Sequence, residues 1–453
     1  MPHAPKHKAP FVSPKLPKLP RVPKPPVDPE AAAIAAALAK ASAKLASTLL
    51  KQLPLTQIRT FSIRNAKEMD EALKYYEEEG LMAVSVFESE ALKKIFCERA
   101  TMSIWNGTLR SCAYSLDVDC ALPYINSEKD VAAMRGVFHG SPRAKQLLKS
   151  AGANPFPNVS FGAPSFGSSF NMLEACELRS NALLAELAQR AFGTDSKAYY
   201  TIDRPINKLP RQGGDEFLHV DNEPFTWSDT TRVKAQVMHG KMVVSDGGTF
   251  ICCPKSHKQS DEITRLYQPL YPNASGMKFQ LDPTKADPLD LYGRTCKYII
   301  EAGTMVMWNS MLFHGVTENT SGRVQQGFYI GFQSDISREL YSSATGVDEV
   351  TDRYNSWRFG IAPKGYPSGD KVHLYPKAWK NYPKIMALYL AKVDHSSPRF
   401  DFSYREMATK KGVMTPDLKE IPDPGYIPQR LSQRAREMLV GEENVGRFDF
   451  SMA

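Results

Sequence analysis

The 453-residue sequence lacks a cysteine pattern that would hold a disulfide framework or a structural zinc ion. Its seven cysteines are odd in number and scattered, and no two of them form a C-x-x-C pair. No apolar run approaches the ~18 residues that a membrane helix needs, and the N-terminus has no apolar core of a secretory signal. These absences favour an intracellular protein of a reducing compartment, and we expect a cytoplasmic location.

Most of the chain also lacks an excess of either charge, although the net charge is +8. Residues 1–53 hold nine Lys and Arg against two acidic residues, and the rest of the chain has 48 basic and 47 acidic side chains. The basic character therefore belongs to an N-terminal tail. Such a tail either has no specific partner or binds an acidic one, meaning nucleic acid, an anionic membrane or an acidic protein.

Proline divides this tail into two parts. It recurs every few residues over 1–28, which excludes a regular helix or ladder and predicts a flexible, extended segment. Asp28-Pro29-Glu30 is typical of a helix start, with a capping acid, Pro at the first helical position and a second acid at the positive end of the dipole. An Ala-rich amphipathic helix is therefore predicted over 29–53, and Pro54 ends it.

The next segment has the signals of a helix, a strand and a second helix. Asn65 is a predicted N-cap, Glu68 would complete a capping box, and Gly80 stands where the residue after a helix belongs. Residues 81–87 have the composition of a strand, and residues 88–105 return to helical spacing. RLSQRAREMLVG (430–441), near the end of the chain, is a further predicted helix.

From about residue 195 to 333 the pattern changes to short apolar or alternating segments separated by Gly, Pro and Asp turns. Strands at this spacing favour a sandwich or barrel over a parallel α/β sheet. The predicted strands are AYYTI, VKAQVMHGKMVV, TFICC, KYII, TMVMW and QGFYIGF. There is no internal repeat, so this β-rich region is expected to form a single unit.

One pair of side chains in this region has the chemistry of a metal site. His219 and Asp221 are two residues apart, and alternation along a strand sends such residues to the same face. An imidazole and a carboxylate make two-thirds of the 2-His-1-carboxylate triad that holds Fe(II) in oxygenases. His314, 95 residues further on, is the candidate third ligand. Arg323 follows it, and its planar guanidinium suits a bidentate contact with a carboxylate.

The sequence resembles the phytanoyl-CoA dioxygenase-like branch of the Fe(II)/2-oxoglutarate-dependent oxygenases. The motifs occur in the family's order, and the resemblance spans roughly residues 66–335. Four stretches carry it: EALKYYEEEGLMAVSVFESEALKKI (71–95), LHVDN (218–222), DGGTFICCPKSHK (246–258) and FHGVTENTSGR (313–323).

The resemblance implies a mainly β fold with flanking helices, built on a double-stranded β-helix (a jelly-roll or cupin-like core) over residues 60–335, with the metal site in 215–325. It implies Fe(II) on His219, Asp221 and His314, 2-oxoglutarate with its distal carboxylate on Arg323, and O2 as the other co-substrate. The expected activity is hydroxylation of a small organic substrate, with decarboxylation of 2-oxoglutarate to succinate. Residues 336–453 would then be an extension that packs on the core or docks a partner.

The sequence departs from the family pattern at one position. Family members often have a hydroxyl residue two positions after the distal histidine, where this chain has Val316. Thr317 and Gln236 are the remaining candidates for a second contact with the co-substrate. Related halogenases have a small residue in place of the carboxylate ligand, so the presence of Asp221 favours hydroxylation.

Other residues have more ordinary interpretations. His257 is expected in a structural turn, His239 as a hydrogen-bonded strand histidine, and Cys252 and Cys253 in buried packing on opposite faces of a strand. Trp227 and Trp308 would either line a substrate cavity or pack beside the metal strands. The alternative function is a non-catalytic interaction or assembly protein that retains the oxygenase fold, with the tail and the C-terminal extension as docking elements.

Overall fold

The structure is a computed structural model. It describes residues 50, 52–115, 173–193, 197–200, 205–208, 218–221, 225, 237–245, 248–272, 279–315, 325–335, 350, 354, 357–358 and 430–451. The predicted tail and nearly all of the predicted helix over 29–53 lie outside these residues, and nothing supports the acidic partner predicted for the tail. In the described part of the chain, no helix is both long and apolar enough to cross a membrane.

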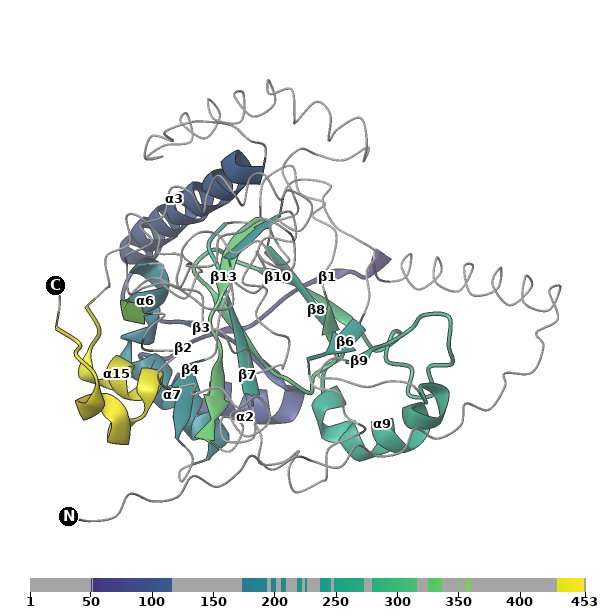
Figure 1. Cartoon of the computed structure of the whole chain (residues 1–453). Coiled ribbons are helices and arrows are strands. Elements are labelled where there is room, and N and C mark those ends of the chain that lie inside the picture. Colours follow the sequence, from purple (N-terminus) through teal and green to yellow (C-terminus); the bar gives the residue numbers. More distant parts are fainter. Residues whose placement is uncertain are drawn as a thin grey trace, which may run out of the picture.

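Fourteen described strands form two mixed sheets, each with one parallel pair (Figure 1). The larger, called the major sheet, has the order β2-β3-β11-β7-β13-β5, and β14 pairs with both β7 and β4. Its strands are β2 (Thr60–Ser62), β3 (Leu81–Ser85), β4 (Ala198–Tyr200), β5 (Pro205–Lys208), β7 (Val237–Val243), β11 (Met305–Asn309), β13 (Gln325–Tyr329) and β14 (Phe332–Ser334).

The other sheet, called the minor sheet, has the order β1-β10-β8-β12-β6-β9. Its strands are β1 (Leu55–Gln57), β6 (Leu218–Val220), β8 (Gly248–Cys252), β9 (Phe279–Gln280), β10 (Cys296–Ile300) and β12 (His314–Gly315). The chain is thus mainly β with some helices, as the sequence predicted.

The two sheets face each other across a shared apolar cluster, called the inner cluster. It contains Val243, Val306 and Trp308 from the major sheet and Phe250, Cys252 and Ile300 from the minor sheet. The rings of Phe250 and Trp308 lie 4.9 Å apart across the interface between the sheets. Side chains that point into this space therefore come from both sheets and from distant parts of the sequence.

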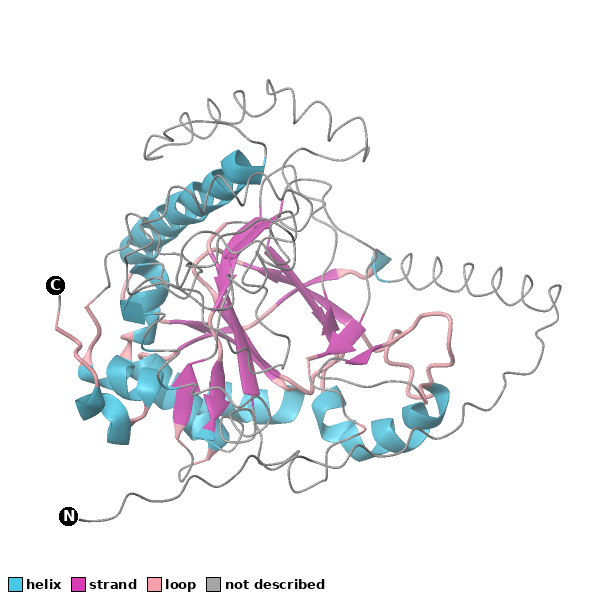
Figure 2. Ribbon diagram, in the orientation of Figure 1, coloured by secondary structure: helices cyan, strands magenta, loops and turns pink. Residues whose placement is uncertain are grey.

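Helices cover the outer faces of the sheets (Figure 2). Those on the major sheet share a second cluster with Met238, Met242, Met305 and Met307, and α9 shares a third with Leu218, Ile251 and Phe279 of the minor sheet. The helices on the major sheet are α2 (Ala66–Glu79), α3 (Glu90–Ser115), α6 (Leu173–Arg179), α7 (Ala182–Phe192) and α15 (Gln433–Val440), and α9 is Ser260–Tyr267. Short 3-10 helices complete the described elements: η2 (Ser256–Gln259), η3 (Gln268–Leu270) and η4 (Glu442–Arg447).

The alternation along β7 decides which of its side chains face the metal region. Met238 and Met242 belong to the cluster under the helices, whereas Val243 belongs to the inner cluster. Because successive side chains on a strand point to opposite faces, His239 and Lys241 share the inward face of Val243. The inner surface of the major sheet thus carries two polar side chains in a largely apolar setting.

The predicted ends of α2 are correct, but its capping box does not form. The side chain of Asn65 accepts hydrogen bonds from the N–H groups of Lys67 and Glu68, and Gly80 adopts a left-handed conformation with φ of 83°. The N–H of Asn65 is already bonded to the carbonyl of Ser62, at 3.1 Å. The carboxylate of Glu68 therefore accepts from the N–H of Ser62 instead, at 2.8 Å.

Each of the six predicted strands overlaps an observed strand, although residues 201–202 and 233–236 of the predicted strands lie outside the described residues. QGFYIGF becomes two strands, β13 and β14, separated by Ile330 and Gly331. At this break the N–H of Ile330 donates to the carbonyl of Gly240 at 2.8 Å, so both new strands remain beside β7. The prediction from local pattern missed the break, where the contact is with a residue 90 positions earlier in the sequence.

Candidate metal centre

Two histidines that are 95 residues apart in the sequence become direct neighbours in the minor sheet. Strand β12 pairs with β6 in the antiparallel sense, and His314 lies opposite His219 in the register. Opposed residues in such a pair project to the same face, and the two ring centroids are 4.3 Å apart. The pairing therefore brings both imidazoles to one point on the inward face.

Asp221 completes the cluster from the residue that directly follows β6. Its N–H donates to the carbonyl of Ser310 at 3.1 Å, which fixes the backbone beside the end of β11. One carboxylate oxygen, Oδ1, is 3.7 Å from Nε2 of His219, and the other, Oδ2, is 3.3 Å from Nε2 of His314. Ligand atoms from His219, Asp221 and His314 all lie within 4.8 Å of one another, so this group has the geometry to hold a metal ion.

The backbone sets which nitrogen of His314 faces the cluster. Its Nδ1 is 2.9 Å from the carbonyl oxygen of Leu312. A carbonyl can only accept a hydrogen bond, so Nδ1 carries the hydrogen and the lone pair of the neutral ring is on Nε2. Nε2 is the nitrogen that faces Asp221, and it is therefore ready to bind a metal.

The two histidines of the cluster are buried in apolar surroundings, and the aspartate is partly exposed. His219 and His314 are 6% and 5% exposed, whereas the side chain of Asp221 is 26% exposed. Phe250 stacks on His314 with an interplanar angle of 14°, and the ring of Trp308 is 5.2 Å from the same imidazole. Trp308, placed by the sequence either in a cavity wall or in packing, thus packs directly beside the metal strands.

A fourth polar side chain reaches the cluster from the major sheet. Nε2 of His239 is 3.3 Å from Oδ2 of Asp221, and its ring is 5.7 Å from that of Trp308. His239 is not among the residues whose ligand atoms lie within 4.8 Å of one another. It was expected to form an ordinary hydrogen bond, and a lone histidine on a strand gave no signal that its partner is the carboxylate of the centre.

We expect His239→Ala to lower the affinity for Fe(II) by about 10-fold, because outer partners that orient a ligating carboxylate contribute 10- to 100-fold to metal affinity. Titration of the metal-free protein with Fe(II) under anaerobic conditions measures the change. His239→Gln retains an N–H donor and should recover part of the affinity. Unchanged affinity in a folded His239→Ala protein would show that the contact does not position Asp221.

The other predicted residues divide into those outside the described chain and those with structural contacts. Arg323, Thr317, Gln236 and Trp227 lie outside the described residues. Cys252 belongs to the inner cluster and Cys253 to the cluster under α9, so the two thiols point to opposite faces as predicted. Burial raises the pKa of Cys253 to about 12 and that of Cys252 well above its ordinary value. Both thiols thus pack in apolar clusters, and neither belongs to the metal cluster.

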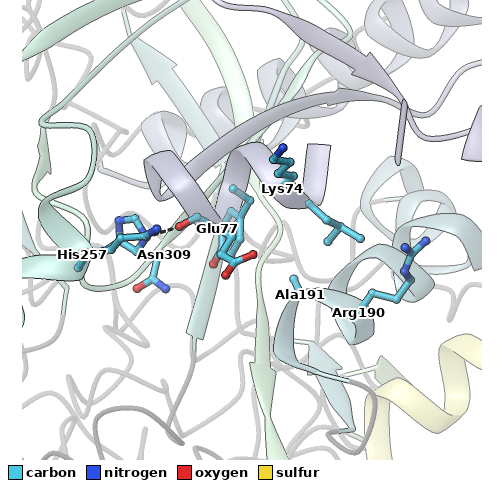
Figure 3. Close-up of a pocket in the computed structure, with 9 residues that line it drawn as sticks. Lys74, Glu77, Arg190, Ala191, His257 and Asn309 are labelled. Carbon is cyan, nitrogen blue, oxygen red and sulfur yellow. Dashed lines mark hydrogen bonds between the residues drawn. The ribbon is translucent and has the colours of Figure 1, made fainter. Parts of the chain in front are cut away.

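His257 lies at a different place, in η2 beside α2 (Figure 3). Its Nε2–H donates to the carbonyl of Glu77 at 3.1 Å, and burial lowers the pKa of the imidazole. It lines a cavity of about 450 Å³ between α2, α7 and η2, where the labelled side chains include Lys74, Arg190 and Asn309 (Figure 3). None of the residues lining this cavity belongs to the metal cluster.

Comparison with protein families finds a match that includes the cluster. Residues 129–327 match the family phytanoyl-CoA dioxygenase (PhyH), a stretch that includes His219, Asp221 and His314. The match covers less than half of the chain, and over these residues the chain is similar to that family. The match begins after residues 71–95, so it does not cover the first of the four stretches on which the sequence resemblance was based. No curated protein matches the chain.

Solved structures also align with the chain. AviO1 from Streptomyces viridochromogenes Tue57 is 13% identical, with 59% of this chain and 95% of that chain covered and a TM-score of 0.31. The epimerase SnoN, solved with Fe3+, alpha ketoglutarate and nogalamycin RO, is 11% identical, with 59% and 84% covered and a TM-score of 0.32. EctD from S. alaskensis, solved with 2-oxoglutarate and 5-hydroxyectoine, is 12% identical, with 58% and 75% covered and a TM-score of 0.33.

Proposed function

We propose that this protein is an Fe(II)/2-oxoglutarate-dependent dioxygenase that hydroxylates a small organic substrate, with decarboxylation of 2-oxoglutarate to succinate. The observation that carries the proposal is the convergence of His219, Asp221 and His314, whose ligand atoms lie within 4.8 Å of one another. The similarity of residues 129–327 to the phytanoyl-CoA dioxygenase family supports the choice of metal and co-substrate.

The donor set fits Fe(II) on chemical grounds. Two neutral imidazoles and one carboxylate form a ligand set that leaves coordination positions open for other molecules. The hydrogen bond from Nδ1 of His314 to the carbonyl of Leu312 supplies the tautomer that a ligand needs. Thiolates, which would favour zinc or an iron–sulfur cluster, do not occur in the cluster of described residues.

We further propose that the two facing sheets form a double-stranded β-helix within a catalytic domain over residues 60–335. In support, the inner cluster lies between the sheets, and the three candidate ligands lie at one edge of it. The packing of Met438 and Leu439 of α15 in the cluster under the helices favours an extension that packs on the core over one that docks a partner.

When bound, the metal with 2-oxoglutarate and O2 would supply the oxidising power to cleave a substrate C–H bond. The residues of the chain hold and enclose that chemistry. Asp221 supplies the negative charge, while Phe250 and Trp308 exclude water from the side of His314. Arg323, Thr317 and Gln236 remain proposals for contacts with the co-substrate, on the basis of the sequence resemblance.

Anaerobic addition of Fe(II) and 2-oxoglutarate to the full-length protein tests the proposal. We expect a weak visible charge-transfer band, which requires the metal and the co-substrate to be bound together. The band should be lost in His219→Ala, which lacks one ligand. If wild-type protein binds Fe(II) and shows no band with 2-oxoglutarate, the proposed function is wrong and the alternative of a non-catalytic assembly protein gains weight.

A further inference from the structure

Lys241 places a positive charge in the space between the two sheets. On β7 it follows His239 by two residues, on the same inward face, and its register partners are Val306 on β11 and Tyr329 on β13. Val306 belongs to the inner cluster, and Tyr329 packs against that cluster. The lysine side chain therefore enters the same space as His239, whose ring contacts Asp221.

The ammonium group reaches from one sheet to the other. Nζ of Lys241 is 3.5 Å from the backbone carbonyl oxygen of Thr249, on β8 of the minor sheet. The next residue on that strand, Phe250, stacks on His314. Strands β7 and β8 lie on facing sheets (Figure 1), so the lysine crosses the gap close to the candidate metal ligands.

Lys241 has no acidic partner among the residues that the structure describes. Its one hydrogen bond there is the long contact with the Thr249 carbonyl, and no described carboxylate lies within 4.0 Å of Nζ. Burial lowers the pKa of the ammonium group to about 8, and no acidic group opposes the effect. Lys241 is half-buried as a residue, and its ammonium group points between the two sheets. An ammonium group removed from water without an anion is costly, and structural lysines in such places are normally paired.

We propose that Lys241 binds a carboxylate group that enters the space between the sheets beside the metal centre. This inference rests on the proposed function, because it assigns a cation to the same site. Residues on the same face of a strand are about 6.6 Å apart, and this is the spacing between the backbone positions of His239 and Lys241. A five-carbon dicarboxylate has a comparable length. The carboxylate comes either from the distal end of 2-oxoglutarate or from an acidic substrate.

The first test compares two oxo acids on full-length protein loaded with Mn(II), by following intrinsic tryptophan fluorescence. 2-Oxoglutarate has the distal carboxylate, and 2-oxopentanoate lacks it. If Lys241 binds that group, Lys241→Met should lower the affinity for 2-oxoglutarate by about 30-fold or more. This is the usual loss when one partner of a buried charge pair is removed. The affinity for 2-oxopentanoate should change by less than about 2-fold, since it has no charge for the lysine to contact.

The second test addresses the other source of the carboxylate. With 2-oxoglutarate saturating, hexanoate and hexanamide are compared as probes of equal length, one charged and one neutral. If Lys241 binds an acidic substrate, wild-type protein should favour hexanoate and Lys241→Met should lose that preference, with 2-oxoglutarate affinity unchanged. If the substitution alters neither 2-oxoglutarate nor hexanoate binding, the proposal is wrong.

A matched variant separates a specific loss of carboxylate binding in Lys241→Met from a general effect of removing a lysine from a sheet. Lys297 on β10 is 5% exposed and lies opposite Ile251, which belongs to the cluster under α9 and not to the inner cluster. Lys297→Met should therefore leave both probes unaffected. Lys241→Gln provides a second variant if Lys241→Met fails to fold. If wild-type protein binds 2-oxoglutarate no better with metal than without it, the proposed function fails, and the hexanoate comparison still decides the role of Lys241.

Discussion

Asp221→Ala should lower the affinity for Fe(II) by more than about 100-fold, because removing a ligand costs more than removing an outer partner. Asp221 is the one charged member of the cluster, and the two imidazoles that remain carry no charge to offset that of the ion. Metal-dependent conversion of 2-oxoglutarate to succinate should fall to background in the same variant. Anaerobic metal titration and measurement of succinate without added substrate check the two effects.

Two further variants make the Asp221 result specific. Asp221→Asn retains the shape of the side chain and removes its charge, so it should bind metal more weakly than wild type but more tightly than Asp221→Ala. Glu78→Ala removes an exposed acid on α2 and should change neither measurement. Succinate formation by Asp221→Ala at the wild-type rate would rule out the proposed ligand set.

The sequence contained enough information to nominate the three ligands. A histidine and an aspartate two residues apart on a strand share a face, whatever the strand pairs with. The distal histidine needed the family resemblance as well, because only the pairing of β6 with β12 brings His314 opposite His219. Arg323, Thr317 and Gln236 stay predictions, since they lie outside the described residues.

The roles of His239 and Lys241 could not be predicted in the same way. Both lie in a predicted strand, and the strand was found where it was expected. Which face of β7 points inward depends on its pairing with β11 and β13 and on its packing against β8, and these contacts join residues far apart in the sequence. A polar residue on a strand is most often on the solvated face, so local pattern alone assigns no function to either side chain.

The two ends of α2 were easier to predict than the hydrogen bond that Glu68 makes. The cap of α2 was predicted from Asn65 and Gly80, whose effects depend only on their own turns. Glu68 was assigned to the N–H of Asn65, yet it bonds to Ser62 because β2 runs directly beside the start of the helix. Ser62 is only three residues before Asn65, so the competing donor was in the local sequence. The error came from the hydrogen bond between the Asn65 N–H and the Ser62 carbonyl, which the capping-box pattern does not include.

The residue between His239 and Lys241 gives the second large prediction. We expect Gly240→Ala to lower the free energy of unfolding by about 3 kcal/mol, the upper end of the usual cost of overpacking a core. A Cβ at this position would lie 1.9 Å from the carbonyl oxygen of Ile330 and 2.6 Å from Cε of Met305. The methionine side chain can move, but the contact atom of Ile330 is a backbone oxygen. The backbone of Ile330 is also fixed, because its N–H donates to the Gly240 carbonyl. The strand itself therefore has to shift.

Such a shift would also move the two polar side chains that β7 directs inward. Gly240→Ala should therefore weaken Fe(II) binding as well, since His239 would lose its 3.3 Å contact with Oδ2 of Asp221. Urea unfolding followed by circular dichroism measures the stability, and Gly446→Ala is the control because no atom lies within 4 Å of a Cβ built there. The control should stay within about 0.5 kcal/mol of wild type. An unchanged unfolding midpoint for Gly240→Ala would mean that β7 and the break at Ile330 are not packed as tightly as the structure has them. The positions of His239 and Lys241 would then lose their support.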